Sequence, residues 1–118
     1  YHWLAVANFD GPSQVFPFTA GVGVDVDAGM SLDTTRAVAA EPFEVNGVQY
    51  IMVGSLSADG STPSKLFRIG FGPLSAIEVA AVNYGGVYCV QSMELGGVTH
   101  ILLAVNQDRP SVLLAVQT

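Results

Sequence analysis

The stretch QYIMVGSLSADGSTPSKLFRI, residues 49–69, decides the fold because it occurs in three related copies along the chain. The other copies are HWLAVANFDGPSQVFPF, residues 2–18, and THILLAVNQDRPSVLLAV, residues 99–116. Each copy has an apolar run, a turn containing Asp and Pro, a Ser, and a second apolar run. Asp10, Asp59 and Asp108 follow one another at intervals of 49 residues. A fixed period of this length is typical of proteins built from one repeated supersecondary unit.

Each period divides into four short strands. In the middle copy we expect strands near residues 36–45, 48–55, 64–69 and 75–82, each rich in Val, Ile, Phe, Tyr or Leu and bounded by turn residues. Asn46–Gly47 and Gly96–Gly97 predict two-residue hairpin turns, since both residues of such a turn take positive φ. No segment shows a sustained helical period, so the chain is predicted to be all-β.

Four-stranded repeats of about 47–51 residues are typical of the blades of a β-propeller. The chain would supply about two and a half blades as a single segment, residues 1–118: a partial blade over 1–33, a blade over 34–83 and a partial blade over 84–118. A propeller closes with about four to eight blades, so further chain or other copies should complete it. A ten-stranded sandwich or barrel is the structural alternative.

The strands differ in how much of their surface is apolar. The runs WLAVA (3–7), YIMVG (50–54) and ILLAV (101–105) are apolar on both faces, which predicts strands sandwiched between neighbouring sheets. The runs VGVDVDA (22–28) and SAIEVAAV (75–82) alternate, which predicts outer strands with one dry face. Cys89 lies in an apolar run, VYCVQSM, and is predicted to be a small buried hydrophobe.

Composition argues against two classes of partner. The net charge is −6 and the four basic residues are scattered, whereas nucleic-acid binding needs clustered Lys and Arg. No run reaches the roughly 18–20 uninterrupted apolar residues of a membrane-spanning helix, so membrane insertion is not expected.

One acidic segment is a candidate calcium loop. DVDAGMSLD, residues 25–33, places Asp25, Asp27 and Asp33 at positions 1, 3 and 9, where a hard cation could collect several oxygen ligands. Gly29 and Met30 stand where such loops usually have an oxygen ligand and a glycine. The alternative is an outer strand with a solvated acidic face. No cofactor other than this calcium is expected.

Two further sets of residues recur at equivalent positions. Trp3, Tyr50 and His100 could stack on sugars in repeated ligand-binding sites, or they could pack between blades. The serines that follow the turns recur as Ser13, Ser64 and Ser111, and no His–Asp arrangement or nucleophile elbow accompanies them. A nucleophile is normally a single residue, so their repetition indicates a structural role. The recurring Asp residues are likewise explained by turn chemistry, because Asp accepts backbone N–H groups.

At the middle copy the chain resembles the EAR (EPTP) repeats of seven-bladed extracellular propellers. The resemblance is carried by Phe43, Val45, Gly47, Tyr50, Ile51, Val53, Ser64 and Phe67, and by their counterparts in the other two copies. Met93 and Leu114 stand where that family has aromatic residues. EAR propellers are protein-binding modules, so the resemblance implies a secreted, non-enzymatic interaction protein.

A shorter stretch, VANFDGPSQVFPF (6–18), resembles the strand–turn–strand unit of lactonase-type propellers. No acidic, basic or His residue of such a site can be matched to a motif here. The sequence therefore predicts a propeller module for interaction and assembly, completed by remaining blades or by other copies and binding a protein or glycan. A multivalent propeller lectin and part of a lactonase-like hydrolase are the alternatives.

Overall fold

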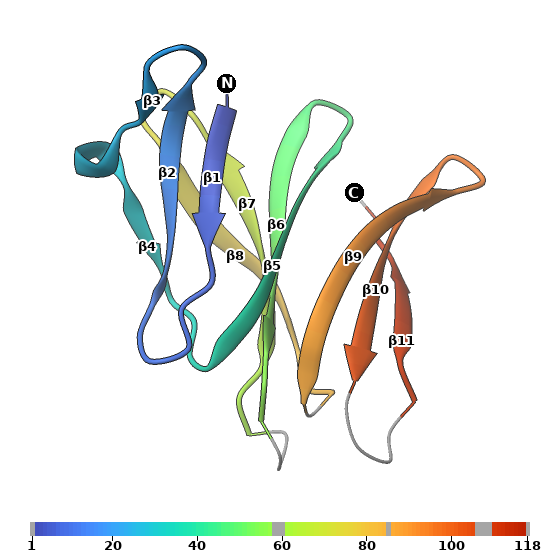
Figure 1. Cartoon of the computed structure of the whole chain (residues 1–118). Helices are drawn as coiled ribbons and strands as arrows, with labels where there is room; N and C mark the ends of the chain where they lie inside the picture. The colour runs from blue at the N-terminus through green and yellow to red at the C-terminus, as the bar shows by residue number, and fades with distance from the viewer. Residues whose placement is uncertain (1, 58–60, 85, 106–109, 118) are drawn as a thin grey trace.

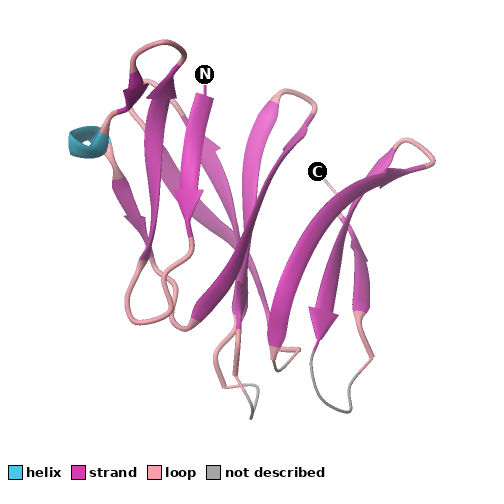
Figure 2. Ribbon diagram, viewed as in Figure 1, coloured by secondary structure: helices cyan, strands magenta, loops and turns pink. Residues whose placement is uncertain are grey.

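The structure, a computed structural model, describes residues 2–57, 61–84, 86–105 and 110–117. Its strands form three antiparallel sheets that stand side by side in chain order (Figure 1). Strand is the dominant element, and the one helical element among the described residues is a 3-10 turn, η1 (Val26–Ala28) (Figure 2). The predicted all-β class is confirmed.

The middle sheet is a complete four-stranded meander in the order β5-β6-β7-β8. Its strands are β5 (Ala37–Val45), β6 (Val48–Ser55), β7 (Ser64–Gly70) and β8 (Ser75–Val82), which agree with the predicted strands to within a residue. Asn46 and Gly47 both have positive φ, 51° and 82°, as the predicted two-residue hairpin requires. Such a four-stranded meander has the form of a propeller blade.

The flanking sheets follow the same plan with fewer full-length strands. The first contains β1 (His2–Val6), β2 (Ser13–Thr19), β3 (Gly23–Val24) and β4 (Met30–Leu32). The third contains β9 (Val87–Leu95), β10 (Val98–Val105) and β11 (Val112–Ala115) in the order β11-β10-β9. By position in the repeat, β1, β6 and β10 are equivalent, and so are β2, β7 and β11. No counterpart of β8 is present among the described residues of the third sheet.

Two hydrophobic cores lie between the sheets. The first core joins the first and middle sheets and includes Val15, Leu32, Ile51, Val53 and Phe67. The second core joins the middle and third sheets and includes Phe43, Met52, Val90, Ile101 and Leu103. Alternate residues of β6 enter different cores, because successive side chains of a strand point to opposite faces. The prediction that this strand is buried on both faces is confirmed.

The spacing between the middle and third sheets depends on a glycine in β6. A Cβ atom added at Gly54 would lie 2.9 Å from Val87 Cγ1 and 2.9 Å from Val90 Cγ2. Both valines belong to β9 and to the second core. The absence of a side chain at Gly54 therefore lets β9 approach β6 closely.

The predicted outer strand at residues 22–28 is wrong. The segment breaks into the short strand β3 and the turn η1, and pairing with β2 resumes only at β4. Gly23 takes a φ of 114°, and the Asp25 side chain accepts a hydrogen bond from the Asp27 backbone N–H. A local side-chain bond of this kind competes with strand pairing. The valines assigned to a dry face are exposed, with Val22 at 84%.

The outer strand of the middle sheet forms as predicted, but its predicted dry face does not. Ile77, Val79 and Ala81 of β8 are all exposed. The β7–β8 pairing shifts register between Leu66 and Phe67, so Ile77 lies opposite Arg68 and Ala81 lies opposite Lys65. This bulge puts Ile77 and Ala81 on opposite faces of the sheet, and the alternating residues therefore do not form one dry face.

The three sheets make an open row; the described residues do not close into a ring (Figure 1). In the described part of the chain, no helix is long and apolar enough to cross a membrane.

Candidate functional site

Equivalent residues of β1, β6 and β10 differ sharply in how much of each side chain is exposed to solvent. The positions that point toward the preceding sheet are buried in the middle and third sheets: Ile51 and Val53 are each 0% exposed, and Ile101 and Leu103 are 2% and 0% exposed. Their counterparts Leu4 and Val6 are 45% and 44% exposed, since no described sheet precedes the first one. The intervening residues Trp3, Ala5 and Ala7 pack against the first core, which fixes the outward direction of Leu4 and Val6.

We call Leu4, Val6 and Phe18 the N-side face. Phe18 is opposite His2 in the β1–β2 pairing, and the two rings meet edge to face with centroids 6.3 Å apart. Phe18 is itself 39% exposed. The prediction that the WLAVA strand is buried on both sides is therefore wrong for the outward side of β1.

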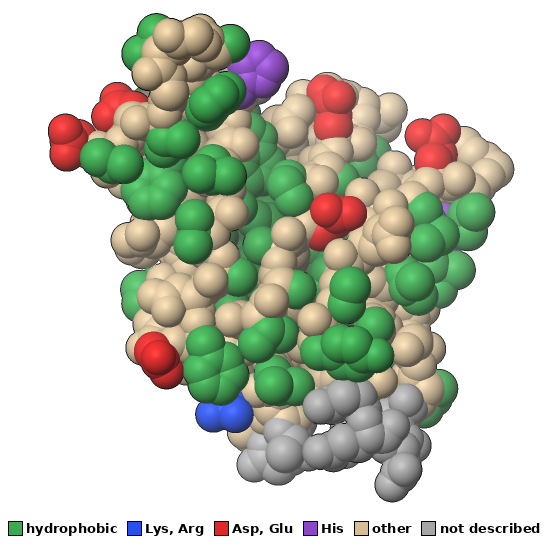
Figure 3. Space-filling view, viewed as in Figure 1, with side chains coloured by type: hydrophobic (Ala, Val, Ile, Leu, Met, Phe, Trp, Pro, Cys, Tyr) green, Lys and Arg blue, Asp and Glu red, His purple; other side chains and the backbone are tan. Residues whose placement is uncertain are grey.

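The opposite end of the row carries a second uncovered surface. Cys89 pairs with Ala104, and Leu102 pairs with Leu113. Alternation with Ile101 and Leu103, which enter the second core, directs these four residues away from the middle sheet. We call Cys89, Leu102, Ala104 and Leu113 the C-side face. Figure 3 shows apolar side chains at the surface both over the first sheet and beside β9.

The predicted burial of Cys89 is wrong, and its place on the C-side face explains why. Its counterpart in the middle sheet is Ala39, which packs against the second core. Cys89 is exposed, and Leu113 is 48% exposed, although the middle-sheet counterpart of Leu113, Leu66, is partly buried against the same core. The N-side and C-side faces carry the same apolar residue types as the buried interfaces between neighbouring sheets. Their side chains are exposed, whereas those of the interfaces are buried.

The interfaces inside the molecule show what covers such faces. Between β5 and β9, Glu41 Oε2 accepts hydrogen bonds from the Ser92 backbone N–H at 2.7 Å and from Ser92 Oγ at 3.2 Å. Between the first and middle sheets, Trp3 Nε1 donates to Gln49 Oε1 at 3.3 Å. Each interface thus combines an apolar core with a few polar contacts between neighbouring sheets.

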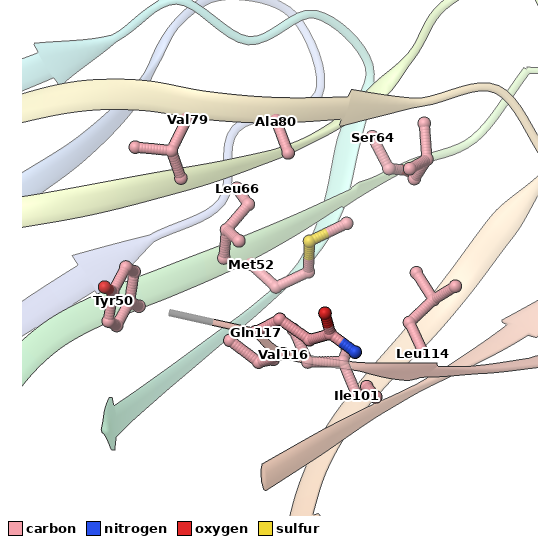
Figure 4. A pocket seen from close by; sticks show the side chains of 12 residues that line it. Tyr50, Met52, Ser64, Leu66, Val79, Ala80, Ile101, Leu114, Val116 and Gln117 are labelled. Atoms are coloured by element: carbon pink, nitrogen blue, oxygen red, sulfur yellow. The ribbon is translucent and has the colours of Figure 1, made fainter. Parts of the chain in front are cut away.

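A cavity of about 480 Å³ opens between the middle and third sheets, where their outer strands part (Figure 4). Its lining is uncharged: Tyr50, Met52, Ser64, Leu66, Val79, Ala80 and Val82 from the middle sheet, and Ile101, Leu114, Ala115, Val116 and Gln117 from the third. An apolar concavity of this size is typical of a ligand-binding site. Sequence reasoning missed this cavity.

Trp3, Tyr50 and His100 belong to different surfaces and do not form one site. Trp3 packs against the first core. Tyr50 packs against the second core and stacks on Phe43, with ring centroids 5.5 Å apart, and it also lines the cavity. His100 is half-buried, with Nδ1 2.9 Å from the Val98 carbonyl oxygen. For Trp3 and Tyr50 this arrangement favours the packing interpretation over repeated sugar sites.

Asp25, Asp27 and Asp33 do not come together as a calcium loop. Asp25 caps the turn η1 through the Asp27 backbone N–H, and Asp33 forms an ion pair with Lys65 at 3.5 Å. In the described ranges, no three His, Cys, Asp or Glu residues are placed to hold a metal ion. The side-chain hydrogen bond between Lys65 and Glu78, with 2.9 Å between Nζ and Oε1, raises the pKa of Lys65 and outweighs the effect of its partial burial.

The recurring serines have one structural role in all three sheets. Ser13 Oγ accepts from the Asn8 backbone N–H at 3.2 Å, Ser64 Oγ from Ser55 at 2.9 Å, and Ser111 Oγ from Val105 at 3.3 Å. Each bond ties the loop back to the end of the preceding strand. Throughout the described ranges, every buried polar side-chain atom has a hydrogen-bond partner.

Of the recurring Asp residues, only Asp10 lies among the described residues. In its loop the side-chain acceptor is Asn8, whose amide oxygen accepts from the Asp10 backbone N–H at 3.2 Å, so this bond does not use the Asp side chain that was predicted to accept. Asp59 and Asp108 lie outside the described residues. Comparison of the chain with protein-family models and with curated proteins found no match.

Proposed function

We propose that this chain is a non-enzymatic interaction and assembly module of the β-propeller type. It completes its fold by packing the N-side and C-side faces against further blade-like sheets, in the same polypeptide or in other copies. The observation that carries the proposal is the exposure of Leu4 and Val6, at 45% and 44%, where their counterparts Ile51 and Val53 are fully buried.

The physical driving force is the burial of apolar side chains. Full burial of a Leu or Val side chain contributes about 1.5–3 kcal/mol, so covering a half-exposed one contributes on the order of 1 kcal/mol. The two faces differ from each other, so packing one against the other joins copies head to tail. Such a contact repeats the internal sheet-on-sheet interfaces, and the loops at the strand ends stay free to meet a protein partner.

The non-enzymatic part of the proposal is supported by the repeated serines, each of which holds a backbone N–H group in its own loop. The extracellular location is supported by the resemblance to EAR repeats alone.

Light scattering after size exclusion, over a range of protein concentrations, tests the proposal. We expect a molar mass that rises above the 12.3 kDa of one chain as concentration increases. Val6→Glu places a charge on the N-side face and should return the mass to that of a monomer. Val22→Glu is the matched control, because Val22 is a turn residue that is already 84% exposed. A stable monomer at every concentration contradicts the packing of these faces against other copies.

A further inference from the structure

The segment that joins the first sheet to the middle sheet contains a strained residue. Arg36, directly before β5, takes a φ of 55°, and a residue with a Cβ atom adopts this left-handed conformation only at a cost. The equivalent residue before β9 is Gly86, since Ala37 and Val87 hold the same place in their sheets. Glycine takes positive φ freely. An arginine kept at this cost indicates that its side chain has a role of its own.

The Arg36 side chain contacts loops of two different sheets. Its guanidinium carbon lies 4.7 Å from the centroid of the Phe9 ring, in the loop between β1 and β2. Its Nε donates to the Leu56 carbonyl oxygen at 2.8 Å, directly after β6. A planar guanidinium group can lie over the ring and aim its Nε–H at the carbonyl at the same time. Both loops emerge at the same end of the first and middle sheets (Figure 1).

The backbone of Arg36 bonds to the same two residues. Its N–H donates to the Phe9 carbonyl oxygen at 3.1 Å, and its carbonyl oxygen accepts from the Leu56 N–H at 3.0 Å. Rotation of Arg36 to a negative φ would turn its N–H relative to its carbonyl group, so the two groups could not both keep these partners. The side-chain contacts therefore hold the strained φ, and the strained φ holds both backbone bonds.

This arrangement is particular to the first junction of the chain. At the junction between the middle and third sheets, the sequence has Gly86 at the position of Arg36 and Ala58 at the position of Phe9. Neither a guanidinium group nor an aromatic ring is available there. The two side-chain contacts are thus not a general requirement for joining one sheet to the next.

We propose that Arg36 is a latch between the first and middle sheets, which keeps the loop after β1 and the loop after β6 together. Loss of either side-chain contact releases both backbone bonds in one step, because both bonds depend on the φ of one residue. The two loops then move independently, while the sheets stay packed through the first core. The latch uses no residue of the N-side or C-side face and does not depend on the proposed assembly.

Amide hydrogen exchange of the dilute chain, followed by NMR for single residues, tests the latch. The protection factors of the Arg36 and Leu56 N–H groups report on the two backbone bonds. If both bonds open in one step, the two factors should agree within about twofold. The Ser55 N–H is the internal reference, because it bonds to Ser64 Oγ and not to the latch.

Two substitutions of Arg36 separate the side-chain contacts from the strain. Arg36→Ala keeps a Cβ atom, and therefore the strain, but removes both contacts. It should lower both protection factors about tenfold and leave that of Ser55 within about twofold. Arg36→Gly also removes both contacts, but glycine takes positive φ freely, so both factors should be about tenfold higher than in Arg36→Ala. Arg68→Ala, at an exposed arginine of β7, is the matched control and should change neither factor.

A substitution in the partner loop tests the latch without changing Arg36. Phe9→Leu removes the attraction between the ring and the guanidinium group but keeps an apolar side chain, and both factors should fall about threefold. This variant also decides the matter if Arg36→Ala does not fold. Equal factors in Arg36→Ala and Arg36→Gly, or a fall at one of the two amides alone, would overturn the proposal.

Discussion

Single residues in this chain repeat because their structural roles repeat. The hydroxyl groups of Ser13, Ser64 and Ser111 each accept a hydrogen bond from the backbone at the end of the preceding strand. Ser13 has an added contact, since Thr34 Oγ1 donates to its hydroxyl at 2.7 Å. The sequence was sufficient to predict a structural role here, because the serine recurs without any catalytic partner. It did not show which N–H group each serine binds, since that depends on the loop geometry.

Replacing Ser64 tests this role. Ser64→Ala leaves the N–H of Ser55 without its partner in a buried position, and we expect a loss of about 1–3 kcal/mol in the free energy of unfolding. Urea denaturation followed by Trp3 fluorescence measures it. Ser111→Ala is the control, because Ser111 is exposed and water can replace its hydroxyl, so we expect a loss below about 1 kcal/mol. Equal losses in the two variants would contradict the expectation that burial of the hydrogen bond determines how much stability it contributes.

At the scale of strands, prediction succeeded where turn chemistry and apolar pattern agree. The four strands of the middle sheet follow from apolar runs bounded by Asn46–Gly47 and by Gly- and Pro-containing turns. Prediction failed at VGVDVDA, where the alternation of valines is that of a strand but the Asp25 side chain stabilises a turn instead. Periodicity cannot detect this competition between a side-chain hydrogen bond and the strand ladder.

The close approach of β6 and β9 leads to a prediction at this scale. Gly54→Val places a side chain against Val87 and Val90, and overpacking of this kind costs about 1–3 kcal/mol. Ala104→Val is the matched control, since Ala104 is the counterpart of Gly54 on the C-side face and no described sheet covers it. We expect its effect on the urea midpoint of the dilute monomer to be small. If Gly54→Val left the urea midpoint unchanged, β6 and β9 would not be held as close together as the structure shows.

At the scale of the whole molecule, the burial predictions failed at the ends of the row and in the outer strands. Cys89 and the outward side of β1 were predicted to be buried, and both are exposed on end faces. The apolar pattern of a repeat reports an interface with a neighbour, but it does not tell whether that neighbour is present. The cavity beside β11 could not be predicted for a similar reason, because it depends on how two sheets part at their outer strands. The mismatch between residue type and exposure is the basis of the proposed assembly.

The reaction rate of Cys89 with a maleimide, measured over a range of protein concentrations, reports directly on the C-side face. If further sheets pack there, the rate constant should fall as concentration rises. Val6→Glu, which removes the complementary N-side face, should keep the rate constant at its value in dilute solution. A rate constant that does not change with concentration, up to the highest that can be reached, would contradict the proposal that the end faces are interfaces.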